Sequence, residues 1–262
     1  MAIAVAQRER VAACGIAVMA KASTPGRAKT RLVPPLTAAE AAQFNTAFLR
    51  DVVENIGDAA AQISIACHVA FGPPRAKRFF RDTLPGDVGL IPAWYPDFGD
   101  CLAGTIVQLL QAGHRAAVVL NSDSPTLPTS LLVETAQVLA QPGDRAVLGP
   151  ADDGGYYLLG LKAAHRGLFR DIAWSTKDVA RQTLERAAAL GLSVHLLPQW
   201  YDVDDPAALK LLQAELFEHA AFAPALRPRL PRHTRALMQS LLAQTDLQDR
   251  LNLGRTFGRA AE

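Results

Sequence analysis

Short apolar segments recur along this chain, and most are followed by a segment with the character of a helix. The clearest is "VAACGIAVMA", residues 11–20, an uninterrupted apolar run of strand length. Such a run is expected for a strand buried on both faces. Similar runs stand at residues 62–71, 88–94, 115–121, 145–150 and 193–198. Alternating units of this size predict an α/β protein with a mainly parallel sheet and helices on both faces.

Several of the predicted helices have recognisable first turns. Thr37 and Glu40 have the spacing of a capping box. Ser175 is interpreted as the cap of a helix that ends at Gly191, and Asp205 as the cap of a helix that starts with proline. Further helices are predicted over residues 74–84, 102–112 and 130–139. A return through "YYLLGL" predicts one antiparallel strand in the sheet.

The sheet pattern ends near Ala223, and the chain then becomes rich in arginine. Residues 224–233, "PALRPRLPRH", have the composition of a linker, and residues 234–253 that of one amphipathic helix. We therefore predict a catalytic domain over residues 11–222 and a helical extension over residues 223–262. The extension packs on the domain or on a second subunit, which makes a homodimer one possible assembly. Its arginines are Arg227, Arg229, Arg232, Arg235, Arg250, Arg255 and Arg259.

The composition of the 262 residues excludes several classes of protein. Half of the residues are apolar, and the formal net charge is only +2, so there is no bulk electrostatic case for nucleic-acid binding. No apolar segment approaches the length needed to span a bilayer. Arg8, Glu9 and Arg10 precede the first apolar run, which is unlike a signal peptide. The three cysteines are far apart and odd in number, so we expect free thiols in a cytoplasmic protein.

Four polar clusters interrupt the apolar scaffold, and each of them follows a predicted strand. They are Lys21–Arg31, Asn121–Ser124, Asp152–Gly155 and Asp202–Asp205. Open α/β sheets bind ligands outside the carboxyl ends of their strands. We therefore expect the four loops to meet at one crevice.

The first loop carries four cations around a Pro-Gly turn. Lys21, Arg27, Lys29 and Arg31 together with the open backbone at Gly26 suit a polyphosphate. The loop lacks the Gly-Lys-Ser/Thr ending of a Walker A motif and the G-x-G-x-x-G fingerprint. The alternative interpretation is a solvated basic loop.

The acids of two other loops supply the opposite charge. Carboxylates brought together repel one another unless a cation or a proton separates them. Asp123, Asp202 and Asp204 are therefore assigned to Mg²⁺ or Mn²⁺, which bind carboxylates together with phosphates. Asp205 is instead assigned to a helix cap. "DVDD" is not an EF-hand loop, because Ala207 stands where that loop needs glycine.

The segment "DDGGYY" offers two acids and two glycines. Gly154 and Gly155 permit positive φ or the close approach of a ligand. Together with Ser122 they are assigned to nucleotide binding. Asp123, Asp152 and Asp153 are the candidate catalytic residues. Asp152 and Asp153 would position an acceptor or act as a base. A plain turn is the competing interpretation.

Five motifs together resemble a known family. "VMAKASTPGRAKTRL", "NSDSPTLP", "LGPADDGGYYLLGL", "WSTKDV" and "YDVDDPAAL" are similar to those of the bacterial DUF2064 family, over residues 16–212. That family is grouped with nucleotide-diphospho-sugar transferases. The resemblance implies a three-layer α/β/α fold of the GT-A type with a mainly parallel mixed sheet. A more distant resemblance is to 2-phospholactate guanylyltransferase.

The resemblance also implies roles for individual residues. Gly26 and the three cations at Arg27, Lys29 and Arg31 contact nucleotide phosphates. Asp123 stands in the place of the metal-binding acid of the DxD motif, which here is "NSD" with only its last acid present. Asp202 and its neighbour Asp204 match the later acidic pair.

The leading hypothesis is a metal-dependent transferase that moves a sugar from a nucleotide-sugar donor to an unknown small-molecule acceptor. The first alternative is nucleotidyl transfer from a nucleoside triphosphate to a phosphorylated acceptor. The second is a non-catalytic, nucleotide-binding member. The second alternative is motivated by the incomplete DxD motif and by the segment "GDCLAG", which stands where the family has a Gly-Leu-Gly-Glu-Arg pattern.

Overall fold

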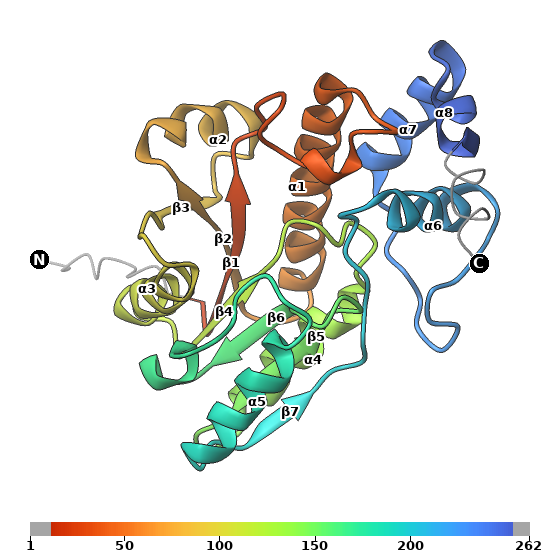
Figure 1. Cartoon of the computed structure of the whole chain (residues 1–262). Coiled ribbons are helices and arrows are strands. Elements are labelled where there is room, and N and C mark those ends of the chain that lie inside the picture. Colours follow the sequence, from red (N-terminus) through yellow and green to blue (C-terminus); the bar gives the residue numbers. More distant parts are fainter. Residues whose placement is uncertain (1–11, 254–262) are drawn as a thin grey trace, which may run out of the picture.

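A computed structural model describes residues 12–253 of the chain as one mixed sheet covered by helices on both faces (Figure 1). The order of its seven strands is β3-β2-β1-β4-β6-β5-β7. All neighbours are parallel except β6, which is antiparallel to β4 and β5. The strands are β1 (Cys14–Lys21), β2 (Ile65–Gly72), β3 (Gly89–Pro92), β4 (Ala116–Leu120), β5 (Ala146–Pro150), β6 (Tyr156–Leu161) and β7 (Val194–Leu196). The predicted α/β class, the mainly parallel sheet and its antiparallel return are confirmed.

The helices divide between the two faces of the sheet. They are α1 (Ala38–Ala60), α2 (Lys77–Thr83), α3 (Phe98–Gln111), α4 (Thr129–Ala140), α5 (Val179–Ala189), α6 (Pro206–Phe217), α7 (Arg232–Gln244) and α8 (Leu247–Leu253). One core holds apolar side chains of α1, α2, α4, α6, α7 and α8, and the other holds those of α3 and α5. These layers leave the carboxyl ends of the strands open for the connecting loops.

Strand β1 shows why a continuous apolar run is needed between two cores. Ile16 and Val18 belong to the α1 core, whereas Ala17 between them belongs to the α3 core. Successive side chains of a strand point to opposite faces, so both sets must be apolar. The same alternation holds in β4, where Val118 and Val119 lie in different cores.

Two of the predicted helix starts are confirmed, and one is wrong. Thr37 and Glu40 form the capping box of α1, and Asp205 accepts a hydrogen bond from the Ala208 amide at the start of α6. Ser175, in contrast, does not cap α5. It has a φ of +64°, and the helix begins four residues later, after Asp178.

The C-terminal extension forms two helices where one was predicted. The break comes at Thr245, which has an extended backbone, and its Oγ1 accepts from the Leu247 amide at the start of α8. Helix α7 packs against α1 of the same chain, and both α7 and α8 contribute side chains to the α1 core (Figure 1). Arg255, Arg259 and the residues before Ala12 lie outside the described residues. Among the helices of residues 12–253, none has the length and apolar content required to cross a membrane.

Candidate functional site

The basic loop, residues 21–31, leaves the end of β1 and turns back toward the sheet. Gly26 and Lys29 both have positive φ, +73° and +50°. Lysine rarely adopts this conformation, so the surrounding structure must hold it. The result is that the Lys29 side chain lies inside the protein, with 5% of it exposed, whereas 73% of the Arg31 side chain is exposed.

The ammonium of Lys29 joins the two acidic loops. Its Nζ lies 2.8 Å from Asp123 Oδ1 and 2.6 Å from Asp204 Oδ1, and it donates to the Val203 carbonyl at 2.9 Å. The Phe48 ring lies on another side, with its centroid 5.4 Å away. Burial alone would lower the pKa of Lys29, but the two carboxylates outweigh it and raise that pKa above its ordinary value. Lys29 is therefore a buried, charged bridge between acids that are remote in sequence.

Further hydrogen bonds fix these carboxylates. Ser122 Oγ donates to Asp123 Oδ1 at 2.9 Å, and Arg31 Nη2 donates to Asp204 Oδ2 at 3.1 Å. The Val203 amide donates to the Asp123 carbonyl at 2.8 Å, which ties the two loops together along the backbone. The acids therefore occupy a prepared arrangement at the sheet edge.

Asp202 lies beside this bridge without touching Lys29 directly. Its Oδ1 accepts from Asn121 Nδ2 and from Ser124 Oγ, each at 2.6 Å. Burial raises the pKa of Asp202 to about 7, with a smaller contribution from the charge of Asp123. The predicted acids Asp123, Asp202 and Asp204 thus come together. Asp123 and Asp204 contact Lys29, whereas Asp202 accepts hydrogen bonds from Asn121 and Ser124.

The Asp152–Gly155 turn reaches the site only in part. The Asp153 carboxylate accepts from the Gly155 amide at 2.8 Å, as in an ordinary turn. Gly154 has a φ of +90°, and a Cβ there would lie 2.1 Å from the carbonyl oxygen of Lys177. The need for glycine at this position therefore comes from the chain itself. Asp152 is exposed, but partial desolvation raises its pKa above the ordinary value.

Three adjoining cavities lie along the carboxyl edge of the sheet, and we call them together the trough. The aromatic cavity, of about 590 Å³, lies at the ends of β1, β2 and β3 and is lined by Trp94, Tyr95 and Phe98 with Lys21, Arg27 and Arg75. The central cavity, of about 340 Å³, is lined by Lys29, Arg31, Asn121, Ser122, Asp123 and Asp204. The distal cavity, of about 470 Å³, is lined by Asp153, Gly155, Trp174, Ser175, Lys177 and Asp202. Met19 and Phe98 line all three.

The aromatic residues of the trough were not among the predicted site residues. Trp94 is 64% exposed, although its ring packs on Gly72, where a Cβ would lie 2.5 Å from it. Tyr95 packs in the same way on Gly104. The available signal was the run "AWYPDF" directly after a strand, because clustered aromatics outside the core mark binding surfaces.

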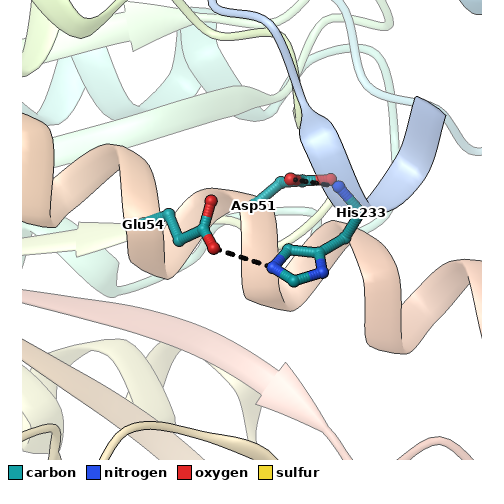
Figure 2. A group of neighbouring side chains, drawn as sticks. All are labelled: Asp51, Glu54 and His233. Carbon is teal, nitrogen blue, oxygen red and sulfur yellow. Dashed lines mark hydrogen bonds and ion pairs between the residues drawn. The ribbon is translucent and has the colours of Figure 1, made fainter. Parts of the chain in front are cut away.

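A second acid–base cluster lies between α1 and α7 (Figure 2). Asp51 is fully buried and accepts from the amides of His233 and Thr234 and from Thr234 Oγ1, at 3.0, 2.8 and 2.6 Å. Glu54 lies 2.7 Å from His233 Nε2 and 3.3 Å from Arg229 Nη2. Asp51 therefore accepts hydrogen bonds from the first turn of α7, and Glu54 contacts two basic side chains. Arg229 Nε also lies 2.8 Å from Asp58 Oδ2. We call Asp51, Glu54, Asp58, Arg229 and His233 the docking cluster.

The trough and the sheet together define an α/β fold of the nucleotide-diphospho-sugar transferase type. A crystal structure named as a "putative nucleotide-diphospho-sugar transferase" from Desulfovibrio desulfuricans G20 is 25% identical, with a TM-score of 0.75 over 88% of this chain and 96% of that chain. The family model "Uncharacterized protein conserved in bacteria (DUF2064)" matches residues 55–176 and confirms the family predicted from the motifs. The match includes Asp123, Asp152 and Asp153; the basic loop and Asp202–Asp204 lie outside it.

Two further structures match the chain at lower similarity. CMP:2-keto-3-deoxy-manno-octonic acid synthetase complexed with CTP is 12% identical, with a TM-score of 0.48 over 79% of this chain and 99% of that chain. A cytidylyltransferase from Leptospira borgpetersenii serovar Hardjo-bovis (strain JB197) is 9% identical, with a TM-score of 0.48 over 90% and 96%. Among curated proteins, none matches the sequence.

Proposed function

We propose that this chain is a transferase that takes a nucleotide-sugar as donor and binds it along the trough. The observation that carries the proposal is the buried Lys29, held by Asp123 and Asp204 at the edge where α/β sheets bind ligands. Side chains of both signs, fixed by one another and lining a cavity, are suited to a ligand that carries phosphates. The similarity to a structure named as a nucleotide-diphospho-sugar transferase supports the same class.

We assign one part of the nucleotide-sugar to each of the three cavities, according to the side chains that line it. The exposed Trp94 and Tyr95 offer flat faces on which a nucleobase can stack. The cations of the basic loop lie next to them around the central cavity, where the diphosphate belongs. The distal cavity then receives the sugar and the acceptor. Trp174, whose ring meets Phe98 edge to face at a centroid distance of 5.3 Å, supplies an apolar wall there.

The carboxylate oxygens of this site fit a divalent cation. The carboxylates of Asp123 and Asp204 converge on one positively charged group, and carboxylate oxygens are the ligands that Mg²⁺ and Mn²⁺ prefer. These two residues would hold the ion, with Asp202 beside them. When bound, the ion would help neutralise the charge that develops on the departing diphosphate.

The remaining steps belong to side chains of the chain itself. Lys29 and Arg31 are placed to neutralise phosphate charge, and orientation together with electrostatics would supply most of the rate. Asp153, which lines the distal cavity, is our candidate for orienting the acceptor hydroxyl. Asp152, the neighbouring acid of the same turn, has a pKa raised by partial desolvation and is the candidate for taking up the proton of that hydroxyl.

Nucleotidyl transfer is the second candidate, favoured by the charge of the basic loop. Lys21, Arg27, Lys29 and Arg31 all line the central cavity, and four cations suit a triphosphate as well as a diphosphate. In that reaction a phosphate of the acceptor attacks the α-phosphorus, and pyrophosphate leaves. The released product distinguishes the two reactions.

The test is a thermal-shift screen of nucleotides and nucleotide-sugars with and without Mn²⁺. A ligand that binds only the folded state raises the melting temperature. We expect a metal-dependent shift that Asp123→Ala removes and that Asp82→Ala, a change at an exposed acid paired with Arg78, preserves. If no nucleotide shifts the wild type, the proposal is wrong. Labelled donors then show whether a nucleoside diphosphate or pyrophosphate is released.

A further inference from the structure

The ammonium of Lys29 stands at the very point on which the two proposed metal ligands converge. A lysine has three N–H donors, and here they have three partners: Asp123, Asp204 and the Val203 carbonyl. The side chain is almost completely buried and packs beside Phe48. A divalent ion cannot share this position, because it would meet a buried positive charge at contact distance.

The charges in direct contact at the bridge are also balanced before any ligand arrives. The carboxylates of Asp123 and Asp204 are matched by Lys29 and Arg31, each of which is in direct contact with one or both of them. A metal ion that arrives alone therefore gains little, since its attraction to the acids is offset by repulsion from the two cations.

A phosphate group changes this balance. The central cavity opens next to Lys29 and Arg31, and it also has Lys21 and Arg27 on its wall. A diphosphate placed there offers the ammonium of Lys29 new anionic partners, and it brings negative charge that the acids alone do not supply. If Lys29 withdraws toward the diphosphate, the Oδ1 atoms of Asp123 and Asp204 become free to bind a metal ion.

We infer that the ammonium of Lys29 occupies the metal position between Asp123 and Asp204 until the nucleotide-sugar binds. This inference rests on the proposed function and adds an order to it: metal and donor bind as one coupled event, and metal alone binds weakly. Thermodynamic linkage requires that each ligand tighten the other by the same factor. Typical coupling between two sites is about 5- to 150-fold.

The test measures Mn²⁺ binding by the loss of the free-ion signal in electron paramagnetic resonance, without donor and without any activity assay. Lys29→Met removes the internal cation and leaves both acids. We expect it to bind Mn²⁺ at least about fivefold more tightly than the wild type. Lys29→Arg, which keeps the charge, should bind as weakly as the wild type. Asp123→Ala added to Lys29→Met should abolish the gain and so locate the ion.

A second measurement uses the wild type with UDP or GDP as probe, corrected for Mn²⁺ held by the nucleotide in solution. Here Mn²⁺ affinity should rise by the factor that Lys29→Met produces or more. If Lys29→Met binds Mn²⁺ no more tightly than the wild type, the inference is wrong. Lys29→Gln repeats the measurement if the Met variant does not fold. A wild type that binds Mn²⁺ tightly without nucleotide would overturn the inference yet leave the proposed function standing, whereas a nucleotide that never stabilises the protein would overturn the function.

Discussion

The bridge at Lys29 and the docking cluster contain the same kinds of residue but serve different ends. In each, a largely buried cation, Lys29 or Arg229, lies among acids that are remote in sequence. In the docking cluster, Asp51 accepts hydrogen bonds from backbone amides of α7, so the cluster attaches α7 to α1. The acids around Lys29, Asp123 and Asp204, instead line the central cavity. The comparison teaches that the surroundings of a buried ion pair, rather than its composition, indicate a binding site.

The largest effect is expected in the docking cluster. Asp51→Ala leaves the amides of His233 and Thr234 and the hydroxyl of Thr234 without their buried acceptor. A buried donor left without a partner typically costs about 1–3 kcal/mol, and three donors are affected here. We expect a loss of this size in the free energy of unfolding, measured in urea, with unchanged nucleotide affinity of the folded protein. Asp51→Asn, which keeps one acceptor oxygen, should lose less and serves if the alanine variant does not fold. A loss below about 1 kcal/mol would contradict the structural role.

The bridge at Lys29 should show the opposite pattern. Asp123→Ala leaves Lys29 paired with Asp204 and the Val203 carbonyl, so the loss of stability should be smaller than that of Asp51→Ala. Transfer activity should fall by about 10²–10³-fold, the usual cost of removing one group that stabilises developing charge. Equilibrium unfolding and initial rates on the same preparation give both numbers. A variant that is unstable yet active would reverse the comparison.

An intermediate effect is expected at Trp94, which lies in the trough but in no ion pair. Trp94→Ala removes an exposed ring, so stability should stay within about 0.5 kcal/mol of the wild type. Loss of a stacking partner for the base should weaken nucleotide binding by about 1–3 kcal/mol, taking base stacking on aromatic side chains as the guide. Titration calorimetry measures the change. Leu253→Ala, at another exposed apolar side chain, is the matched control.

The smallest effect concerns Glu54 and is visible in the pH dependence. Burial alone would raise the pKa of Glu54, but His233 and Arg229 outweigh it and hold that pKa below its ordinary 4.5. A lowered pKa means that the charged form stabilises the fold above pH 4.5 and that this contribution is lost as the pH falls through the folded value. Glu54→Gln should therefore cost about 1 kcal/mol or less at pH 7, because Glu54 is partly exposed. The difference from the wild type should shrink as the pH falls below 4.5; a difference that grows in acid would refute this assignment.

Local patterns made much of the fold predictable. The apolar runs gave the strands, and the capping residues Thr37 and Asp205 gave two helix starts, because each signal acts within a few residues. Ser175 was assigned wrongly, since the chain there is shaped by a tertiary contact. The Ala180 amide donates to the Gly154 carbonyl, and Lys177 packs against the same glycine. A cap preference cannot anticipate such a contact.

The candidate site was predictable in its members but not in its arrangement. Strand ends of a parallel sheet share one edge, so Lys29, Asp123 and Asp204 were expected to be neighbours. That Lys29 points inward and spans to an acid 175 residues away depends on the strained backbone of the loop, which no spacing rule reveals. Asp51 shows the same limit, because its partner His233 lies 182 residues away and follows the linker.

The most direct test of the central claim is a crystal structure of the protein with Mn²⁺ and a bound nucleotide-sugar, with the ion located by its anomalous scattering. We predict Mn²⁺ between Asp123 and Asp204, the diphosphate in the central cavity, and the ammonium of Lys29 on a phosphate oxygen. Mn²⁺ among Asp51, Glu54 and His233, with Lys29 still bridging its two acids and the trough empty, would contradict the account.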